Sequence, residues 1–304
     1  MDESKPTLVV DHVTKRFGDF TAVSDLSLQV KPGRVFGLIG PNGAGKTTTI
    51  RMIVNITAPD SGRIELLGQP MTTVMQDRIG YLPEERGLYR RMKVGEQLRF
   101  FAELKDLSGR EADQRIDSWL KKLGLSEWKD KRAKDLSKGM QQKIQFIASV
   151  IHEPDLLILD EPFSGLDPVS VDLMKETILE QKASGKTIIL STHQMEIAER
   201  LCEDVCMINK SRKVFDGRLR EIRRSFAQNT VALRVEGADG LLDDRELIMN
   251  VRQNGDDTEV LLTPEASAQT LLKHLVDANV KISKFELIEP TLHDIFVAKV
   301  KEPA

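Results

Sequence analysis

The residues best suited to chemistry lie in a glycine-rich stretch, GPNGAGKTT, at positions 40–48. This stretch fits the pattern G-x-x-x-x-G-K-[ST], and it has the required context of a buried apolar strand before it and a helix after it. Backbone N–H groups of such a loop can surround phosphate oxygens, Lys46 can reach the β- and γ-phosphates, and Thr47 can offer a hydroxyl to Mg²⁺. A glycine turn that merely caps a helix is the weaker interpretation in this context. The predicted phosphate-binding residues are Gly40, Pro41, Asn42, Gly43, Ala44, Gly45, Lys46, Thr47 and Thr48.

An acidic pair, Asp160 and Glu161, follows a second buried apolar strand in LLILDEP. Asp160 is placed to hold Mg²⁺, and Glu161 to orient or deprotonate a water that attacks the γ-phosphate. Without further context, two acids at a strand end would simply belong to a turn. A third strand ends in STHQ with His193, whose side chain could point at the same end of the sheet. A lone histidine is more often structural, but its place at a strand end favours a function.

A further candidate is the start of a helix in LSKGM, residues 136–140. Ser137 is a good N-cap residue, and Gly139 leaves the backbone bare. The first turn therefore offers N–H groups and a positive dipole end, which suit an anion. The spacing alone leaves open whether this helix start completes the phosphate site or forms a different one.

The elements that must position these residues alternate between short apolar strands and amphipathic helices. This alternation predicts an α/β fold with a mostly parallel sheet and helices on its faces. Residues 94–152 are typical of successive helices, which predicts a helical subdomain inserted into a domain over 1–226. Residues 227–304 predict a small α+β domain, with a turn at NGDD between two alternating runs and a helix at ASAQTLLKHLV.

Composition restricts the class of protein. The chain has 304 residues, 40% of them apolar, and a net charge of −3, so it has no global basic field that would attract nucleic acid. The start, MDESKPTLVV, has no signal pattern, and no apolar run comes near the roughly 18 residues that a membrane helix needs. Cys202 and Cys206 are too few for a disulfide framework or a metal site and are expected to be buried thiols. These features indicate a cytoplasmic protein.

The motifs GPNGAGKTT, LSKGM, LLILDEP, SGLD and STH occur in the order and rough spacing of the ATP-binding-cassette ATPases. Over residues 7 to about 217 the sequence resembles this family, which implies a P-loop NTPase core that binds ATP and Mg²⁺ and hydrolyses ATP. LSKGM is similar to the family signature LSGGQ, with Lys138 and Met140 at its third and fifth places. The resemblance implies that this signature faces the ATP of a second copy. The residues implied to act in trans are Ser137, Gly139, Met140 and Asp167.

Two of the family positions have a second interpretation. SGLD, residues 164–167, resembles the family's dimer-interface loop, yet Asp167 followed by Pro168 is also a suitable N-cap and first helical position. Phe17 matches the aromatic residue that stacks on adenine, and the alternative for it is packing in the core.

One departure from the family affects the metal site. The family usually places Gln directly after the residue that matches Pro83, where it contacts Mg²⁺ and water, whereas this chain has Glu84. A carboxylate there adds a third negative charge beside Asp160 and Glu161, which predicts a strict Mg²⁺ requirement. Glu85 is the alternative neighbour of the metal. The metal ligands expected from the resemblance are Thr47, Asp160 and Glu84.

The stretch ERGLYRRMK, residues 85–93, carries Arg86, Arg90, Arg91 and Lys93 around Leu88 and Tyr89. In the family this segment leads into the helical subdomain that receives a short helix of a membrane partner. It is therefore a candidate coupling surface, and an ordinary solvated loop is the alternative.

The C-terminal stretch ELIEPTLHDIFVAKV resembles the tail of ATPases that serve bacterial exporters, among them sodium and drug exporters. The resemblance implies a cytoplasmic ATPase subunit that closes as a homodimer and drives a permease from the inner face of the cell membrane, with no nucleic acid partner. One alternative is a soluble cassette ATPase acting on DNA or ribosomes, which typically carries two cassettes or a long coiled-coil insertion. Another is a nucleotide-gated interaction protein, against which the complete set of Lys46, Asp160, Glu161 and His193 argues.

Overall fold

A computed structural model describes residues 5–301 except 86, 227–229, 237–239 and 264. It divides into two compact units, Met1–Leu219 and Arg220–Ala304. The sequence predicts a domain boundary after residue 226, close to this division. Arg223, in α7 (Leu219–Ser225), donates hydrogen bonds to the carbonyl oxygens of Glu289 and Pro290 in the second unit.

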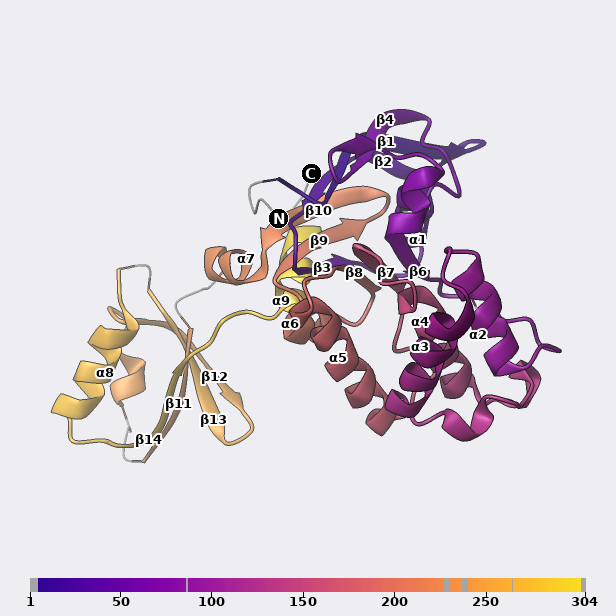
Figure 1. Cartoon of the computed structure of the whole chain (residues 1–304). Coiled ribbons are helices and arrows are strands. Elements are labelled where there is room, and N and C mark those ends of the chain that lie inside the picture. Colours follow the sequence, from indigo (N-terminus) through magenta and orange to yellow (C-terminus); the bar gives the residue numbers. More distant parts are fainter. Residues whose placement is uncertain (1–4, 86, 227–229, 237–239, 264, 302–304) are drawn as a thin grey trace. The chain divides into compact units, whose positions relative to one another are not determined.

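The central sheet of the first unit is mostly parallel, as predicted (Figure 1). Every residue of its strands β3, β7 and β8 is buried, which explains why these strands are continuous apolar runs rather than alternating ones. Only β10 runs antiparallel to its neighbour, β9. In spatial order the strands are β10 (Arg212–Arg218), β9 (Asp204–Asn209), β3 (Val35–Ile39), β8 (Thr187–Thr192), β7 (Leu156–Asp160) and β6 (Ile79–Leu82).

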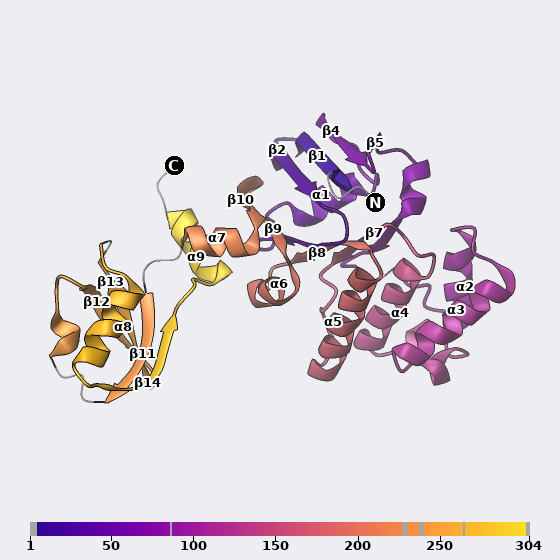
Figure 2. The same cartoon turned by 60° about the vertical axis from the view of Figure 1, so that its left-hand side comes forward.

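Three helices follow the strands that carry the motifs. In Figure 2, α1 (Lys46–Ile53) lies on one side of the central sheet, and α5 (Pro168–Ala183) and α6 (Met195–Leu201) lie on the other. The predicted cap of α5 is confirmed, because the Asp167 side chain accepts a hydrogen bond of 3.0 Å from the Ser170 N–H.

A second, antiparallel sheet in this unit was not predicted. It packs with α1 into one apolar core, to which Leu8, Leu26 and Ile50 contribute. Its alternation is hard to recognise in the sequence because β-bulges interrupt the pairing, and two residues of these strands, His12 and Asp25, have positive φ. Its strands are β2 (Phe20–Val30), β1 (Leu8–Phe17), β4 (Ser61–Leu66) and β5 (Gln69–Pro70).

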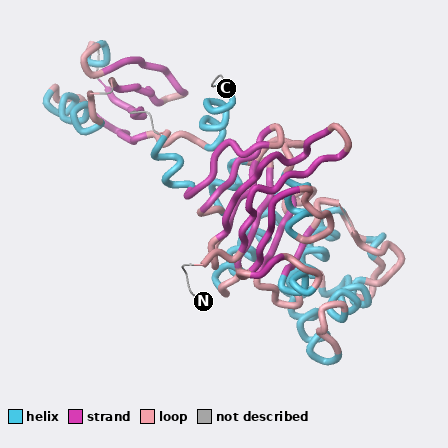
Figure 3. Tube along the Cα trace, turned by 90° about the horizontal axis from the view of Figure 1, so that it is seen from above, coloured by secondary structure: helices cyan, strands magenta, loops and turns pink. Residues whose placement is uncertain are grey.

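Residues 94–152 contain α2 (Val94–Glu103), α3 (Gly109–Lys122) and α4 (Lys138–Val150). These helices lie at one end of the first unit, beyond the strands (Figure 3). The predicted N-cap of α4 is confirmed, because the Ser137 hydroxyl accepts a 3.2 Å hydrogen bond from the Met140 N–H.

The second unit contains an antiparallel sheet with α8 (Ala268–Asp277) packed on one face. The predicted turn at NGDD joins β12 to β13, since Asn254 pairs with Asp257 and Gly255 has a φ of 60°. The helix α9 (Leu292–Lys301) follows the sheet. The strand order is β12 (Ile248–Asn254), β13 (Asp257–Leu262), β11 (Thr230–Glu236) and β14 (Lys281–Leu287).

Both cysteines are buried free thiols, as predicted, and burial raises the pKa of Cys202 and of Cys206. In the described part of the chain, we find no helix with the length and apolar character needed to cross a membrane.

The central sheet provides a test of the core. Leu38, in β3, is 1% exposed, so Leu38→Ala should destabilise the first unit by about 2–5 kcal/mol. Both tryptophans of the chain, Trp119 and Trp128, lie in this unit, so urea unfolding followed by tryptophan fluorescence reports on it. The matched control is Leu179→Ala on α5, where the side chain is 42% exposed. Equal effects of the two changes would contradict this placement of the core.

Candidate functional site

At two positions of the loop between β3 and α1, the backbone conformation and the nearby atoms leave room only for glycine. Gly40 and Gly45 have φ values of 151° and 112°. A Cβ at Gly40 would lie 2.1 Å from the Ile208 carbonyl oxygen, and one at Gly45 would lie 2.4 Å from the Ala22 carbonyl oxygen. Gly45 also stands at the N-cap of α1 and, having no side chain, cannot accept hydrogen bonds from the first helical N–H groups. This helix start is therefore suited to phosphate oxygens.

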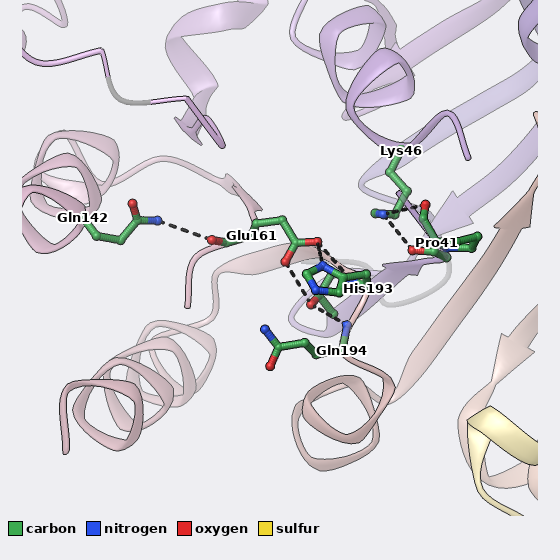
Figure 4. Close-up of polar contacts among 8 residues, drawn as sticks. Pro41, Lys46, Gln142, Glu161, His193 and Gln194 are labelled. Atoms are coloured by element: carbon green, nitrogen blue, oxygen red, sulfur yellow. Dashed lines mark hydrogen bonds and ion pairs between the residues drawn. The ribbon is translucent and has the colours of Figure 1, made fainter. Parts of the chain in front are cut away.

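Lys46 is a buried cation directly behind this loop. Its side chain is 6% exposed, and its Nζ donates hydrogen bonds of 2.7 Å to the Gly40 carbonyl and 3.1 Å to the Pro41 carbonyl (Figure 4). Burial lowers the pKa of Lys46, and the nearby carboxylates of Glu161 and Asp160 oppose this effect. The lysine is thus an ammonium group held where phosphate would bind.

A cleft of about 370 Å³ brings most of the predicted phosphate, metal and water-orienting residues together. It joins the phosphate loop to the ends of β6 and β7, although these segments lie far apart in the sequence. The residues that line it are Phe20, Ala22, Asn42, Gly43, Gly45, Lys46, Thr47, Thr48, Glu84, Asp160 and Glu161.

Asp160 is the residue best suited to a metal ion. Its side chain is fully buried, and neither carboxylate oxygen makes a hydrogen bond to another described residue. Burial raises the pKa of Asp160, while the hydroxyls of Ser191 and Thr47 lie close enough to oppose the shift. A buried carboxylate without partners beside a threonine hydroxyl fits Mg²⁺, which usually takes one or two protein ligands and completes its shell with water and phosphate. Within the described ranges, no group of three acidic, histidine or cysteine side chains forms a denser metal site.

Glu161 is held in one orientation by the end of the neighbouring strand. Its backbone has a φ of 50°, and its N–H donates to the Ser191 carbonyl at 3.0 Å. One carboxylate oxygen accepts hydrogen bonds from the His193 N–H at 2.9 Å and from the His193 Nδ1 at 2.7 Å (Figure 4). The other oxygen accepts a longer bond of 3.3 Å from the Thr192 hydroxyl. Since a carboxylate only accepts, the ring proton is assigned to Nδ1.

The structure places Glu84 and Glu85 differently. Glu84 lines the cleft, and its charge acts on both Lys46 and Asp160. Glu85 is not among the lining residues, and its carbonyl accepts a hydrogen bond of 3.4 Å from Gln145 in α4.

The residues expected to act in trans lie outside this cleft. Ser137 and Asp167 are exposed caps of their helices. A Cβ at Gly139 would lie 3.3 Å from the Gly165 carbonyl oxygen, so this glycine also lets the signature pack against the loop before α5. Hydrogen bonds from Ser170 lower the pKa of Asp167.

Two phenylalanines stand at the tip of the hairpin between β1 and β2. Phe17 is 54% exposed, which excludes packing in the core, and Lys15 Nζ lies 5.6 Å from its ring centroid. Phe20 pairs with Phe17 across the turn, is 61% exposed and lines the cleft, although the sequence analysis did not single it out. The sequence signal that could have found it is the Gly18-Asp19 turn in KRFGDFTAV, which sets Phe20 opposite Phe17 across the hairpin.

Comparison with known proteins gives two family matches. Residues 23–164 match the ABC transporter family, and residues 217–300 match the C-terminal domain of DrrA1-3-like ATP-binding proteins.

Individual relatives match over longer stretches. The uncharacterized ABC transporter ATP-binding protein YhaQ of Bacillus subtilis (strain 168) is 45% identical, over 96% of this chain and 98% of that protein. The Nod factor export ATP-binding protein I of Cupriavidus metallidurans is 40% identical, over 71% of this chain and 72% of its own length.

Solved structures match nearly three quarters of the chain. The structure of an ATP-binding subunit of an ABC transporter is 34% identical, with a TM-score of 0.68, and covers 72% of this chain and 93% of that chain. The structure of cbiO1 from Clostridium perfringens, part of the ABC transporter complex cbiONQ, is 28% identical with a TM-score of 0.63, over 73% and 94% of the two chains. The motifs, their geometry and these relatives together show that the chain belongs to the ATP-binding proteins of ABC transporters and is an ABC transporter ATPase.

Proposed function

We propose that this ATPase hydrolyses Mg-ATP at sites shared between two copies of the chain and thereby drives a separate membrane permease, for export. The observation that carries the hydrolytic part is the fixed carboxylate of Glu161, which stands beside the buried Asp160 and Lys46 in one cleft. A site that only bound nucleotide would not need a second, oriented carboxylate.

The proposed mechanism assigns one task to each part of the cleft. The N–H groups of residues 40–48 bind phosphate oxygens, and Lys46 neutralises charge on the β- and γ-phosphates. Thr47 and Asp160 would hold Mg²⁺, with Glu84 near its water ligands, and the ion would neutralise the charge that develops on the transferred phosphate. Glu161 orients the attacking water and accepts its proton, and His193 keeps that carboxylate in place. Phe17 remains the proposed adenine contact, and Phe20 lies beside it.

The position of the signature supports the proposal of a shared site. Ser137 and Asp167 are exposed and lie outside the cleft of their own chain. The start of α4 nevertheless has the free N–H groups that suit an anion. Packing of two copies head to tail would bring Ser137, Gly139, Met140 and Asp167 of one copy to the ATP held by Lys46 of the other.

Coupling to a permease is supported by the surface around Tyr89, just before the helical subdomain of residues 94–152. Tyr89 is 55% exposed and lies against Phe100 and Phe101, at centroid distances of 5.8 Å and 6.3 Å. Arg90 and Arg91 are exposed beside it, whereas Arg86 lies outside the described residues. A neighbouring groove of about 280 Å³, lined in part by Phe101 and Leu104, could receive a short amphipathic helix.

Export is proposed from the relatives. One of them is a Nod factor export ATP-binding protein, and the second unit matches a DrrA1-3-like domain. The sodium and drug exporters that the sequence resembles agree with this direction of transport. The proposal places the chain in the cytoplasm, on the inner face of the membrane beside its permease, without a nucleic acid partner.

The first functional test replaces the water-orienting carboxylate. Glu161→Gln should keep ATP binding, lower kcat by about 100-fold or more and accumulate an ATP-bound dimer, because the amide accepts no proton. Turnover assays and size-exclusion chromatography with Mg-ATP measure these effects. The matched control is Glu176→Gln on the exposed side of α5. A variant that stays monomeric or hydrolyses ATP near the wild-type rate would refute the role of Glu161.

The second test concerns the departure at Glu84. Glu84→Gln should leave nucleotide binding intact and reduce the repulsion among the cleft carboxylates, so binding should depend less strictly on Mg²⁺. Titration with a fluorescent ATP analogue at several Mg²⁺ concentrations measures this. Glu85→Gln is the control and should bind like the wild type. Loss of binding in Glu84→Gln, or a changed Mg²⁺ dependence in Glu85→Gln alone, would make Glu85 the neighbour of the metal.

The third test uses two inactive variants to reveal a shared site. Lys46→Ala damages the phosphate loop and Ser137→Arg damages the signature, so each homodimer should be nearly inactive. In a mixed dimer one site carries both changes and the other carries neither, so mixing should restore measurable hydrolysis. A tandem fusion of the two variants controls for failure to exchange subunits. Absence of activity and of ATP occlusion in both arrangements would show that the signature does not act in trans.

A further inference from the structure

The helix that begins at the signature carries two buried glutamines one turn apart. Gln142 is 2% exposed and Gln145 is 5% exposed, and their spacing of three residues places them on the same side of α4. Buried glutamine amides cost stability unless they are hydrogen-bonded, so their partners indicate what they do.

Gln142 contacts the backbone around the water-orienting residue. Its Nε2 donates a long hydrogen bond of 3.5 Å to the carbonyl oxygen of Glu161 (Figure 4). It also donates one of 3.3 Å to the carbonyl oxygen of Pro162. Carbonyls only accept, so the amide nitrogen must face them. Glu161 has a φ of 50°, a left-handed conformation that costs a non-glycine residue energy and needs support from its surroundings.

Gln145 contacts the loop that carries the other cleft carboxylate. Its Nε2 donates a 3.4 Å hydrogen bond to the Glu85 carbonyl, next to Glu84. Its Oε1 is buried and has no hydrogen-bond partner among the described residues. An unpaired buried acceptor costs about 1–3 kcal/mol, so stability does not favour a glutamine here over an apolar residue of the same size.

We propose that Gln142 and Gln145 are positioning residues that together set where the carboxylates of Glu161 and Glu84 lie in the cleft. This inference rests on the roles proposed above for those two carboxylates. One helix contacts both loops, and that helix starts at Ser137. Contact of a second copy at Ser137 would therefore reach both carboxylates through a single rigid element.

The test replaces each glutamine by methionine, which has a similar length and no donor. Because a shift of about 1 Å in a reacting group can cost 100-fold in rate, Gln142→Met and Gln145→Met should each lower kcat about 10- to 100-fold. KM for ATP should stay within about twofold, since neither residue lines the nucleotide cleft. Gln145→Met should unfold at the same or a higher urea concentration, a combination that a purely structural role does not produce.

A second readout needs neither nucleotide nor Mg²⁺. Amide hydrogen exchange should become faster around residues 160–164 in Gln142→Met and around 82–85 in Gln145→Met. The control is Thr177→Val in α5, which removes a buried hydrogen bond to the Leu173 carbonyl of the same helix and should change neither kcat nor this exchange.

The outcomes separate this inference from the proposed function. Wild-type kcat and exchange in both glutamine variants would overturn it, as would a loss of rate no greater than that of Thr177→Val. If Glu161→Gln is inactive while both glutamine variants are fully active, only the positioning role fails. If Glu161→Gln itself turns over normally, the proposed role of Glu161 fails, and the positioning role fails with it.

Discussion

The contact between the Glu161 carboxylate and His193 depends on the register of two parallel strands. β7 and β8 pair so that Asp160 lies opposite Ser191, and the residues that follow each strand therefore meet at the same edge of the sheet. A shift of one residue in that register would turn Asp160 away from the cleft and separate Glu161 from the histidine. The register in which these two buried strands pair is thus a condition for the chemistry.

Several negative charges lie close together at this same edge of the sheet. Three carboxylates line the cleft, those of Asp160, Glu161 and Glu84, and Lys46 supplies one ammonium group. Such a set is favourable only when cations join it, and a nucleotide adds further negative charge. Burial raises the pKa of Asp160, which reflects the cost of a bare charge at this position. A divalent cation, as proposed for this cleft, would therefore offset repulsion among the carboxylates and the phosphates as well as take part in the chemistry.

Structural features that depend on residues close together in the sequence could be predicted from the sequence. Buried strands, the caps at Ser137 and Asp167 and the hairpin turn at Gly255 follow from short-range chemistry, and the structure confirms them. The order of the motifs carried the family resemblance on which several predicted roles of the site residues rested. The structure brings the phosphate loop and the acids into one cleft.

The features that the sequence did not predict depend on contacts between distant segments. Bulges obscured the antiparallel sheet, Phe20 reaches the cleft only because a hairpin folds it there, and the partners of Gln142 lie on another strand's loop. The state of the two cysteines, in contrast, was predicted from their small number and from the apolar character of a free thiol, and it has a practical value. Because Cys202 and Cys206 are buried and burial raises their pKa, thiol reagents meet little exposed thiolate on the chain. The wild-type protein is therefore a suitable background for attaching a fluorophore or spin label at a single introduced cysteine, without first removing the native ones.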